Sequence, residues 1–159
     1  MNIIDYNARY DEDIKDLLVE LQEYIVLIDR DGYNIITDEY REIKFKKTIK
    51  EIANFNGKML LAVENDKVTG LIVGLINNEE QSDYEFKAPK RGRVAELIVS
   101  SNCRAKGIGK QLMDKMEAYF KSVGCQAILI EVFAYNEKAK SFYCKNNYSD
   151  RNFEVMKKL

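Results

Sequence analysis

Hydrophobic residues recur every three or four positions over much of the first third of the chain. After a short apolar segment at residues 2–6 that predicts an opening strand, this spacing predicts a helix that ends near Gly32. The apolar stripe of this helix consists of Ile14, Leu17, Leu18, Leu21, Ile25 and Ile28. A looser stripe between Asp38 and Asn54 predicts a second helix, because the following Asn-Gly pair is a typical helix end.

The hydrophobic period changes to that of strands after residue 57. Residues 59–64 (MLLAVE) and 68–76 (VTGLIVGLI) flank a short polar turn and predict an antiparallel hairpin with both arms buried. The polar residues 77–92, which include the only proline, predict an exposed connection. Residues 93–99 (RVAELIV) return to the strand pattern.

Two more helices and two more strands are predicted in the remainder of the chain. Helical spacing over residues 109–123 stops at a glycine, and the apolar run AILIEVF at 127–133 predicts a strand. Asn136 is a suitable N-cap for a helix that continues through Lys145. A last short strand is expected around residues 153–156.

The order of these elements predicts the fold class. One strand, two helices and three strands are followed by alternating helices and strands, which is too mixed for a regular doubly wound sheet. We therefore expect an α/β (α+β) layer with a mainly antiparallel sheet. The 159 residues contain no segment that resembles a linker, so residues 1–159 are expected to form a single domain.

Composition excludes several classes of protein. With a net charge of −1, the chain lacks the overall positive charge of a dedicated nucleic-acid binder. A local cluster of basic residues could still bind nucleic acid, but its acidic neighbours make this a weak hypothesis; the cluster consists of Lys87, Lys90, Arg91 and Arg93. The N-terminus lacks the pattern of a secretory signal, and the apolar runs are far shorter than the ~20 residues that cross a bilayer. We expect a cytoplasmic protein without a membrane or nucleic-acid partner.

The chain contains no histidine, which limits its catalytic chemistry. Acid–base steps must use carboxylates, tyrosine, lysine or bound water, because His-dependent nucleophiles and metal sites are excluded. Cys103, Cys125 and Cys144 lack metal-binding spacing and are interpreted as ordinary thiols. No metal site is expected.

The segment RAKGIGK, residues 104–110, lies between a predicted strand and a predicted helix. Its two glycines permit close approach of a ligand to the backbone, and the N–H groups and dipole of the following helix would attract an anion. A phosphate fits this combination, although a plain strand-to-helix turn with solvated cations explains the glycines as well. The spacing matches neither the P-loop nor the dinucleotide-binding pattern, since Arg104, Gln111 and Leu112 occupy positions that those motifs reserve for Gly, Ser/Thr and Gly.

Two motifs in the second half of the chain resemble those of the GNAT superfamily of acyl-CoA-dependent N-acetyltransferases. The family pattern Arg/Gln-x-x-Gly-x-Gly/Ala is matched by Arg104, Gly107 and Gly109. The pattern Asn-x-x-Ala-x-x-Phe-Tyr, followed after three residues by Gly-Phe, is matched by Asn136, Ala139, Phe142, Tyr143 and then Asn147-Tyr148. Only the glycine differs, and asparagine at 147 suits a left-handed helix exit. The motifs cover residues 93–148, and the order of elements is similar over nearly the whole chain.

The resemblance implies a fold, a cosubstrate and a set of binding residues. It implies a GNAT-like fold with about six to seven strands and about four helices, and acetyl-CoA as the cosubstrate. Backbone donors around the basic turn would hold the pyrophosphate, while residues at the end of the preceding strand and Asn136 would hold the pantetheine arm. The implied residues are Leu97, Ile98, Val99, Arg104, Ala105, Lys106, Gly107, Ile108, Gly109, Lys110, Asn136 and Tyr143.

The resemblance also implies direct attack of an amine on the thioester, with coenzyme A leaving as a thiolate. Glu96, which interrupts an apolar strand, is a candidate general base, but it can equally pair with a nearby cation. Tyr143 occupies the place of the family's general acid, although it can also be an aromatic packing residue. A backbone N–H near the end of strand 94–99 is the expected oxyanion donor.

The acceptor is weakly encoded. Family architecture suggests that the connection between the first two helices borders the acceptor site, where an acidic group could attract a cationic amine or could simply be solvated. This group consists of Asp29, Asp31, Asp38 and Glu39. A small-molecule amine or a peptide is the leading hypothesis, while a protein lysine or N-terminus, and a regulatory module that binds acyl-CoA without turnover, remain alternatives. A homodimer is also left open.

Overall fold

A computed structural model describes residues 1–77 and 89–158 of the chain. The chain begins with strand β1 (Asn2–Asp5), a short 3-10 turn (Ala8–Tyr10) and helices α1 (Asp11–Ile28) and α2 (Tyr40–Asn54). Strands β2 (Lys58–Glu64), β3 (Lys67–Asn77) and β4 (Arg91–Val99) follow. A second 3-10 turn (Ser101–Cys103), α3 (Ile108–Ser122), β5 (Ala127–Ile130) and α4 (Glu137–Lys145) complete the order.

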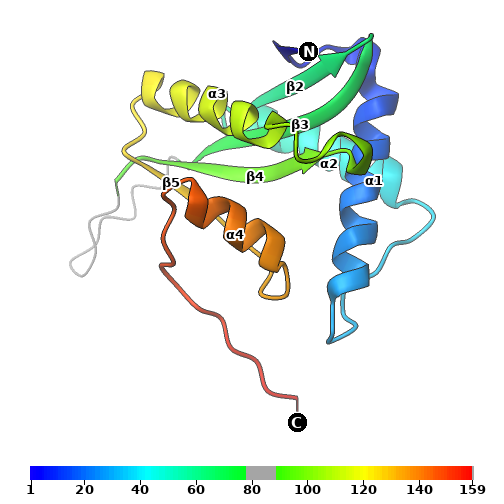
Figure 1. Cartoon of the computed structure of the whole chain (residues 1–159), viewed down its shortest axis with the longest axis vertical. Helices are drawn as coiled ribbons and strands as arrows, with labels where there is room; N and C mark the ends of the chain where they lie inside the picture. Colours follow the sequence, from blue (N-terminus) through cyan, green and yellow to red (C-terminus); the bar gives the residue numbers. More distant parts are fainter. Residues whose placement is uncertain (78–88, 159) are drawn as a thin grey trace.

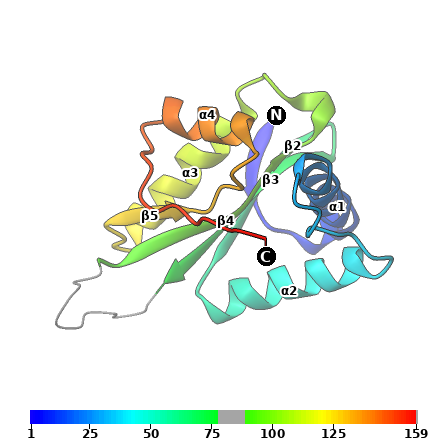
Figure 2. The same cartoon turned by 90° about the horizontal axis from the view of Figure 1, so that it is seen from below.

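The strands form one sheet with helices on both faces. The strand order is β1-β2-β3-β4-β5, and every neighbouring pair is antiparallel except β4 and β5, which are parallel. Helices α1 and α2 cover one face, and α3 and α4 cover the other, as the two perpendicular views show (Figures 1 and 2). The mixed α/β fold predicted from the order of elements is therefore confirmed.

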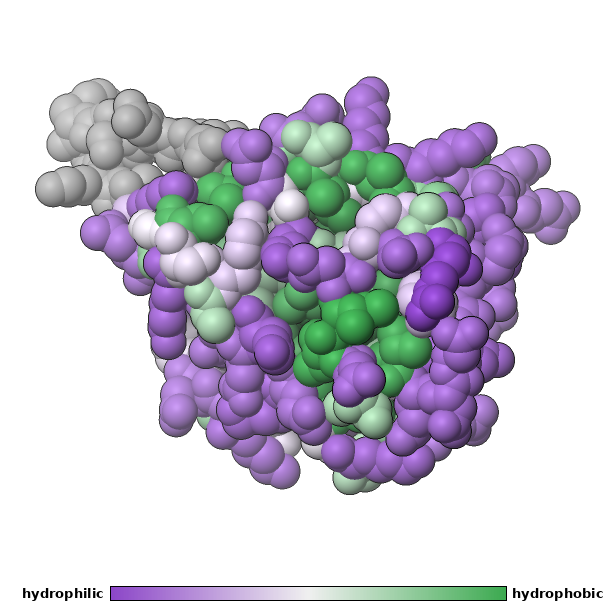
Figure 3. Space-filling view, turned by 90° about the horizontal axis from the view of Figure 1, so that it is seen from above, coloured by the Kyte–Doolittle hydropathy of each residue, from purple (hydrophilic) through white to green (hydrophobic). Residues whose placement is uncertain are grey.

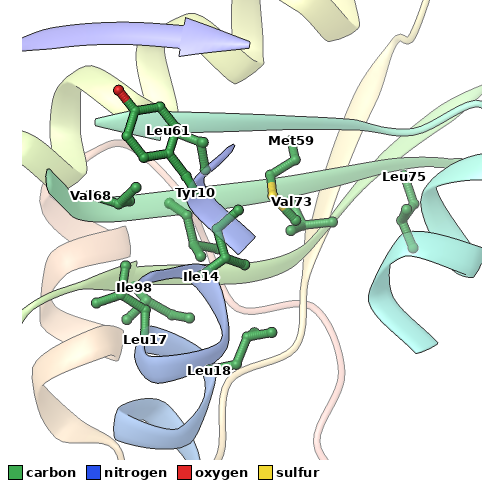
Figure 4. Packing of buried hydrophobic residues seen from close by; sticks show 11 residues of the cluster. Tyr10, Ile14, Leu17, Leu18, Met59, Leu61, Val68, Val73, Leu75 and Ile98 are labelled. Carbon is green, nitrogen blue, oxygen red and sulfur yellow. The ribbon is translucent and has the colours of Figure 1, made fainter. Parts of the chain in front are cut away.

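Each face of the sheet has its own hydrophobic core. On one face, the apolar stripe of α1 packs on side chains of the central strands (Figure 4), with Ile14 and Leu18 fully buried. On the other face, α3 buries Leu112, Met116 and Phe120 against the same strands. The view from above shows mostly polar side chains with apolar patches among them (Figure 3). Each of these helices buries one stripe of apolar side chains against the sheet, which is why the apolar periodicity of the sequence predicted both α1 and α3.

The described residues form five strands, fewer than the six to seven that the family resemblance implied. The strand expected over 127–133 ends at Ile130, and the segment expected to form a last strand at 153–156 has no regular structure, with Phe153, Val155 and Met156 exposed. Strand propensity alone does not make a strand, because a ladder requires a hydrogen-bonded neighbour. Most of the connection predicted to be exposed, residues 78–88, lies outside the described residues.

A β-bulge in β4 changes which face its side chains occupy. Glu96 pairs with Val73 but Val94 pairs with Gly74, so Ala95 is one residue too many on β4. Val94 packs on the α3 side of the sheet and Ile98 on the α1 side, although an even spacing would normally keep both on one face. The bulge therefore turns Glu96 toward the face covered by α1 and α2.

The same region of β4 lacks a partner on its other edge. Pairing with β5 covers only Arg91–Val94, so among the described residues no strand lies beside Ala95–Val99 on that side. Backbone groups on such an edge are available to an extended ligand, which can add to the sheet like a further strand.

Replacing Gly92→Ala should destabilise the fold. A Cβ at Gly92 would lie 2.6 Å from ring atoms of Phe120, whose side chain is only 1% exposed, so the ring or the strand must shift. We expect a loss of about 1–3 kcal/mol in the free energy of unfolding, measured by urea denaturation. The matched control is Gly109→Ala, where the new Cβ would make only ordinary contacts at 3.6 Å or more. Equal denaturation midpoints for the two variants would contradict this packing argument.

Candidate active site

The basic turn predicted to bind a phosphate presents a series of free backbone donors. Gly107 has φ of +76° and Ala105 has φ of +63°, so the chain turns sharply between β4 and α3. Ile108 anchors the turn, since its side chain is 3% exposed within the core on the α3 side. Within the described part of the chain, none of the N–H groups from Lys106 to Lys110 donates a hydrogen bond. These donors and the positive end of α3 make a site for an anion.

Arg104 is bound to the protein itself. Its guanidinium donates to the carbonyl of Val99 at 3.0 Å and pairs with the carboxylate of Glu20 at 3.3 Å. The same carboxylate accepts the N–H of Ser101 at 2.7 Å, so Glu20 on α1 ties down the start of the turn. No sequence pattern predicted this role for Glu20. Lys110 pairs with Asp114, while Lys106 is exposed and makes no ion pair with any described residue.

The three strand residues implied to hold pantetheine alternate between the two cores. Leu97 and Val99 pack on the α3 side, whereas Ile98 is buried on the α1 side. All three belong to the part of β4 that has no neighbour on the β5 side. Their side chains thus hold the strand in place, and their backbone is what a ligand could reach.

Asn136 caps α4, as its position predicted. Its Oδ1 accepts the N–H of Ala139 at 3.1 Å and also the hydroxyl of Tyr24 at the longer distance of 3.5 Å. Its side-chain amide donates no hydrogen bond to a described residue. At the other end of α4, Asn147 has φ of +65°, the left-handed conformation that the family glycine would adopt.

Tyr143 projects from α4 into the core on the α3 side. Its ring makes edge contacts with Phe142 and Tyr148 at centroid distances of 5.3 Å and 5.8 Å. Burial raises the pKa of its phenol to about 12, and the negative charge of Glu96 acts in the same direction. The hydroxyl has no hydrogen-bond partner among the described residues. Tyr143 is therefore protonated at neutral pH.

Glu96 meets side chains from α2 that sequence analysis did not single out. Its carboxylate forms a close ion pair with the ammonium of Lys44, and the two side chains are only 12% and 22% exposed. Burial, followed by the charge of Glu96, raises the pKa of Tyr40 to about 12. The cation that the sequence left as an alternative partner for Glu96 is thus present. The helical spacing of Tyr40 and Lys44 was the available signal, because residues four apart share one face.

The acidic residues expected at the acceptor side do not form one group. Asp29 accepts the N–H groups of Asp31, Tyr33 and Asn34, and these bonds, led by that of Asn34, lower its pKa to about 2. Asp31 accepts the hydroxyl of Tyr135 at 3.2 Å. Asp38 and Glu39 are exposed. Asp29 therefore shapes the loop after α1, and Asp31 connects that loop to the segment before α4.

Two features of the described residues concern metals and membranes. No group of three or more His, Cys, Asp or Glu residues in residues 1–77 and 89–158 is arranged to hold a metal ion. The helices in that part of the chain are all too short or too polar to span a bilayer.

Known proteins share both the sequence pattern and the fold. The glucosamine 6-phosphate N-acetyltransferase of Arabidopsis thaliana is 21% identical over 126 residues, which cover 79% of this chain and 83% of that protein. A mutant of a Bacillus halodurans protein superimposes with a TM-score of 0.84 at 18% identity, covering 100% of this chain and 99% of that one. The aminoglycoside N-acetyltransferase AAC(6')-Iy, solved in complex with CoA, gives a TM-score of 0.71 at 11% identity over 99% of this chain and 98% of its own.

The family assignment follows from a family model together with this geometry. The model for the acetyltransferase (GNAT) family matches residues 22–148, a range that includes the candidate base, the basic turn and the candidate acid. The relatives are named as acetyltransferases, which identifies the chain as an acyltransferase enzyme. The chain belongs to the GNAT family of acetyltransferases.

Proposed function

We propose that this enzyme transfers the acetyl group of acetyl-CoA to a primary amine of a small molecule or a peptide by direct attack. The observation that carries the proposal is the position of Glu96 and Tyr143. Glu96 lies on the part of β4 that β5 does not cover, Tyr143 lies on α4, and the charge of Glu96 contributes to the raised pKa of Tyr143. A protonated phenol and a carboxylate that interact electrostatically suit a reaction that takes a proton from an amine and gives one to a thiolate.

Acetyl-CoA is the proposed cosubstrate because the chain offers contacts along its length. The free N–H groups of residues 106–110 suit the pyrophosphate, and the open edge of β4 at residues 97–99 suits the extended pantetheine arm. The unused side-chain amide of Asn136 lies at the start of α4. The likeness to a structure solved with CoA supports this assignment.

Three parts of the chain would act as the general base, the donor to the oxyanion and the general acid. Glu96 accepts a proton from the incoming ammonium, which otherwise stays protonated at neutral pH because the pKa of an alkylamine is about 10.4. A backbone N–H of residues 97–99 donates to the oxygen that gains negative charge. Tyr143 donates toward the departing sulfur.

The acceptor is proposed to be a primary amine on a small molecule or a peptide. Relatives named for glucosamine 6-phosphate and for aminoglycosides support a small-molecule amine. A screen of amines, amino sugars and peptides for acetyl-CoA-dependent thiol release tests the proposal. Acetyl-CoA binding without turnover of any acceptor would favour the regulatory alternative, and turnover of protein substrates alone would favour a protein lysine or N-terminal acetyltransferase.

Gly107→Val should weaken acetyl-CoA binding much more than Lys106→Ala. Valine resists the φ of +76° observed at Gly107, so the turn that aligns the free N–H groups would distort. Lys106 is exposed, and losing one exposed charge costs little. We expect a loss of at least about tenfold in affinity for the first variant, against about twofold to threefold for the second. Calorimetric titration of both folded variants would measure this, and equal losses would refute the backbone cradle.

A further inference from the structure

The side chain of Lys44 is paired with Glu96, the general base of the proposed reaction. The ammonium of Lys44 contacts the carboxylate of Glu96, and both side chains are largely shielded from solvent. Lys46 and Lys47, its near neighbours on α2, are exposed and make no contact with Glu96. Glu96 thus already binds a primary ammonium of the kind that it would deprotonate in an acceptor.

The same carboxylate belongs to the open part of β4, and its charge acts on tyrosines from two helices. The charge of Glu96 acts on Tyr40 from α2 and on Tyr143 from α4. The bulge at Ala95 directs Glu96 to the α2 face, and β4 has no strand beside it on the β5 side at this level. Lys44 and Glu96 therefore lie in contact beside the part of β4 along which the proposed cosubstrate would extend.

We infer that Lys44 is itself an acetyl acceptor, and that the chain acetylates its own Lys44 when acetyl-CoA is bound and no other amine is present. This inference rests on the proposed function, because it uses the same base, acid and cosubstrate. An amine fixed at the site reacts without the entropy cost of bringing an acceptor from solution, which favours the reaction strongly.

The step balances without a further reactant. Glu96 takes one proton from the Lys44 ammonium, and the freed Nζ forms a bond to the acetyl carbon. The bond from that carbon to sulfur breaks, and the sulfur leaves with its electron pair and takes a proton from Tyr143. The second proton of the amine, lost as the amide forms, passes to solvent. Glu96 then releases its proton and Tyr143 regains one by exchange with solvent, so both side chains return to their starting states. The products are N-acetyl-lysine at position 44 and free coenzyme A.

Acetylation would remove the positive charge that now faces Glu96. A neutral amide cannot form the Lys44–Glu96 ion pair, so the base would lose its cation while the acetylated side chain fills the adjacent space. The modification would consequently change the enzyme's own activity toward other amines.

The test is acetylation of the full chain by acetyl-CoA without an added acceptor, followed by mass-spectrometric peptide mapping over time. We expect Lys44 to be acetylated at least about tenfold faster than Lys46 and Lys47, which report ordinary chemical acetylation of exposed lysines. Glu96→Gln and Gly107→Val should each slow the acetylation of Lys44 without changing the acetylation rates of Lys46 and Lys47. Lys44→Arg preserves a cation opposite Glu96 and should abolish only this modification.

Three outcomes separate the inference from the proposed function. If calorimetry shows acetyl-CoA binding but Lys44 reacts no faster than Lys46 and Lys47, the inference is overturned and the proposed function stands. If acetyl-CoA does not bind, the proposed function fails, and the inference fails with it. A rate constant for Lys44 that rises with protein concentration would show transfer between copies, which overturns acetylation within one chain.

Discussion

Tyr143→Phe should lower turnover by about 10²–10³ while acetyl-CoA affinity stays within about twofold. The substitution removes one oxygen and keeps the ring that packs at 5.3 Å from Phe142. The pKa of about 12 keeps the phenol protonated from pH 6 to 9, so the wild-type donor does not titrate in that range. Steady-state rates and calorimetric affinities for the two proteins measure the effect.

The loss caused by Tyr143→Phe should depend on pH. A coenzyme A thiol with a cysteine-like pKa of about 8.5 leaves more easily without help as the solution becomes alkaline, so the loss should shrink toward pH 9. Tyr148→Phe is the matched control, since it also removes a hydroxyl from this aromatic group, but one that is bound to Glu117. Full activity of Tyr143→Phe at pH 6 would return Tyr143 to a packing role, and loss of acetyl-CoA binding would make it a ligand contact.

Glu96→Gln should lower turnover at neutral pH by about 10² and recover part of it at alkaline pH. The amide keeps the shape of the side chain but cannot accept the proton, so the reaction must wait for acceptor that is already neutral. That fraction grows tenfold with each pH unit below the amine's pKa of about 10.4. A pH–rate profile from pH 6 to 10, recorded beside that of the parent, measures the change.

The ion pair with Lys44 requires a second variant in the same experiment. Glu96→Gln leaves the Lys44 ammonium, whose side chain is 22% exposed, without its partner, and this alone can reduce stability. The double variant Glu96→Gln/Lys44→Gln removes both charges and should regain stability but not neutral-pH turnover. A profile identical in shape to that of the parent protein would remove Glu96 from the role of base.

Several local features were readable from the sequence because neighbouring residues decide them. The apolar stripe predicted for α1 is the side of the helix that faces the core. Strands β2 and β3 form the predicted hairpin, and Asn136 caps α4. Asn147 adopted the left-handed conformation expected at the helix exit. Each of these depends on periodicity, capping or turn chemistry within a few positions, which is why they could be predicted.

The arrangement of the site was not readable in the same way. Lys44 and Glu96 are far apart in the sequence, and they meet only because the bulge at Ala95 turns Glu96 toward α2. The sequence of β4 contains no signal for that extra residue, since its register is set by pairing with β3. Arg104 was expected to face a phosphate, but Glu20 and the carbonyl of Val99 hold it.

The sequence by itself determined the family, the kind of cosubstrate that its motifs imply and the residues from which acid and base must come, because a chain without histidine leaves few alternatives. Only the tertiary structure decided which cation opposes Glu96, which backbone donors remain free and where strand pairing stops. The physical reason is the separation along the sequence of the residues that interact. Helix stripes and caps are local, whereas the partner of a buried charge and the edge of a sheet depend on segments that only folding brings together.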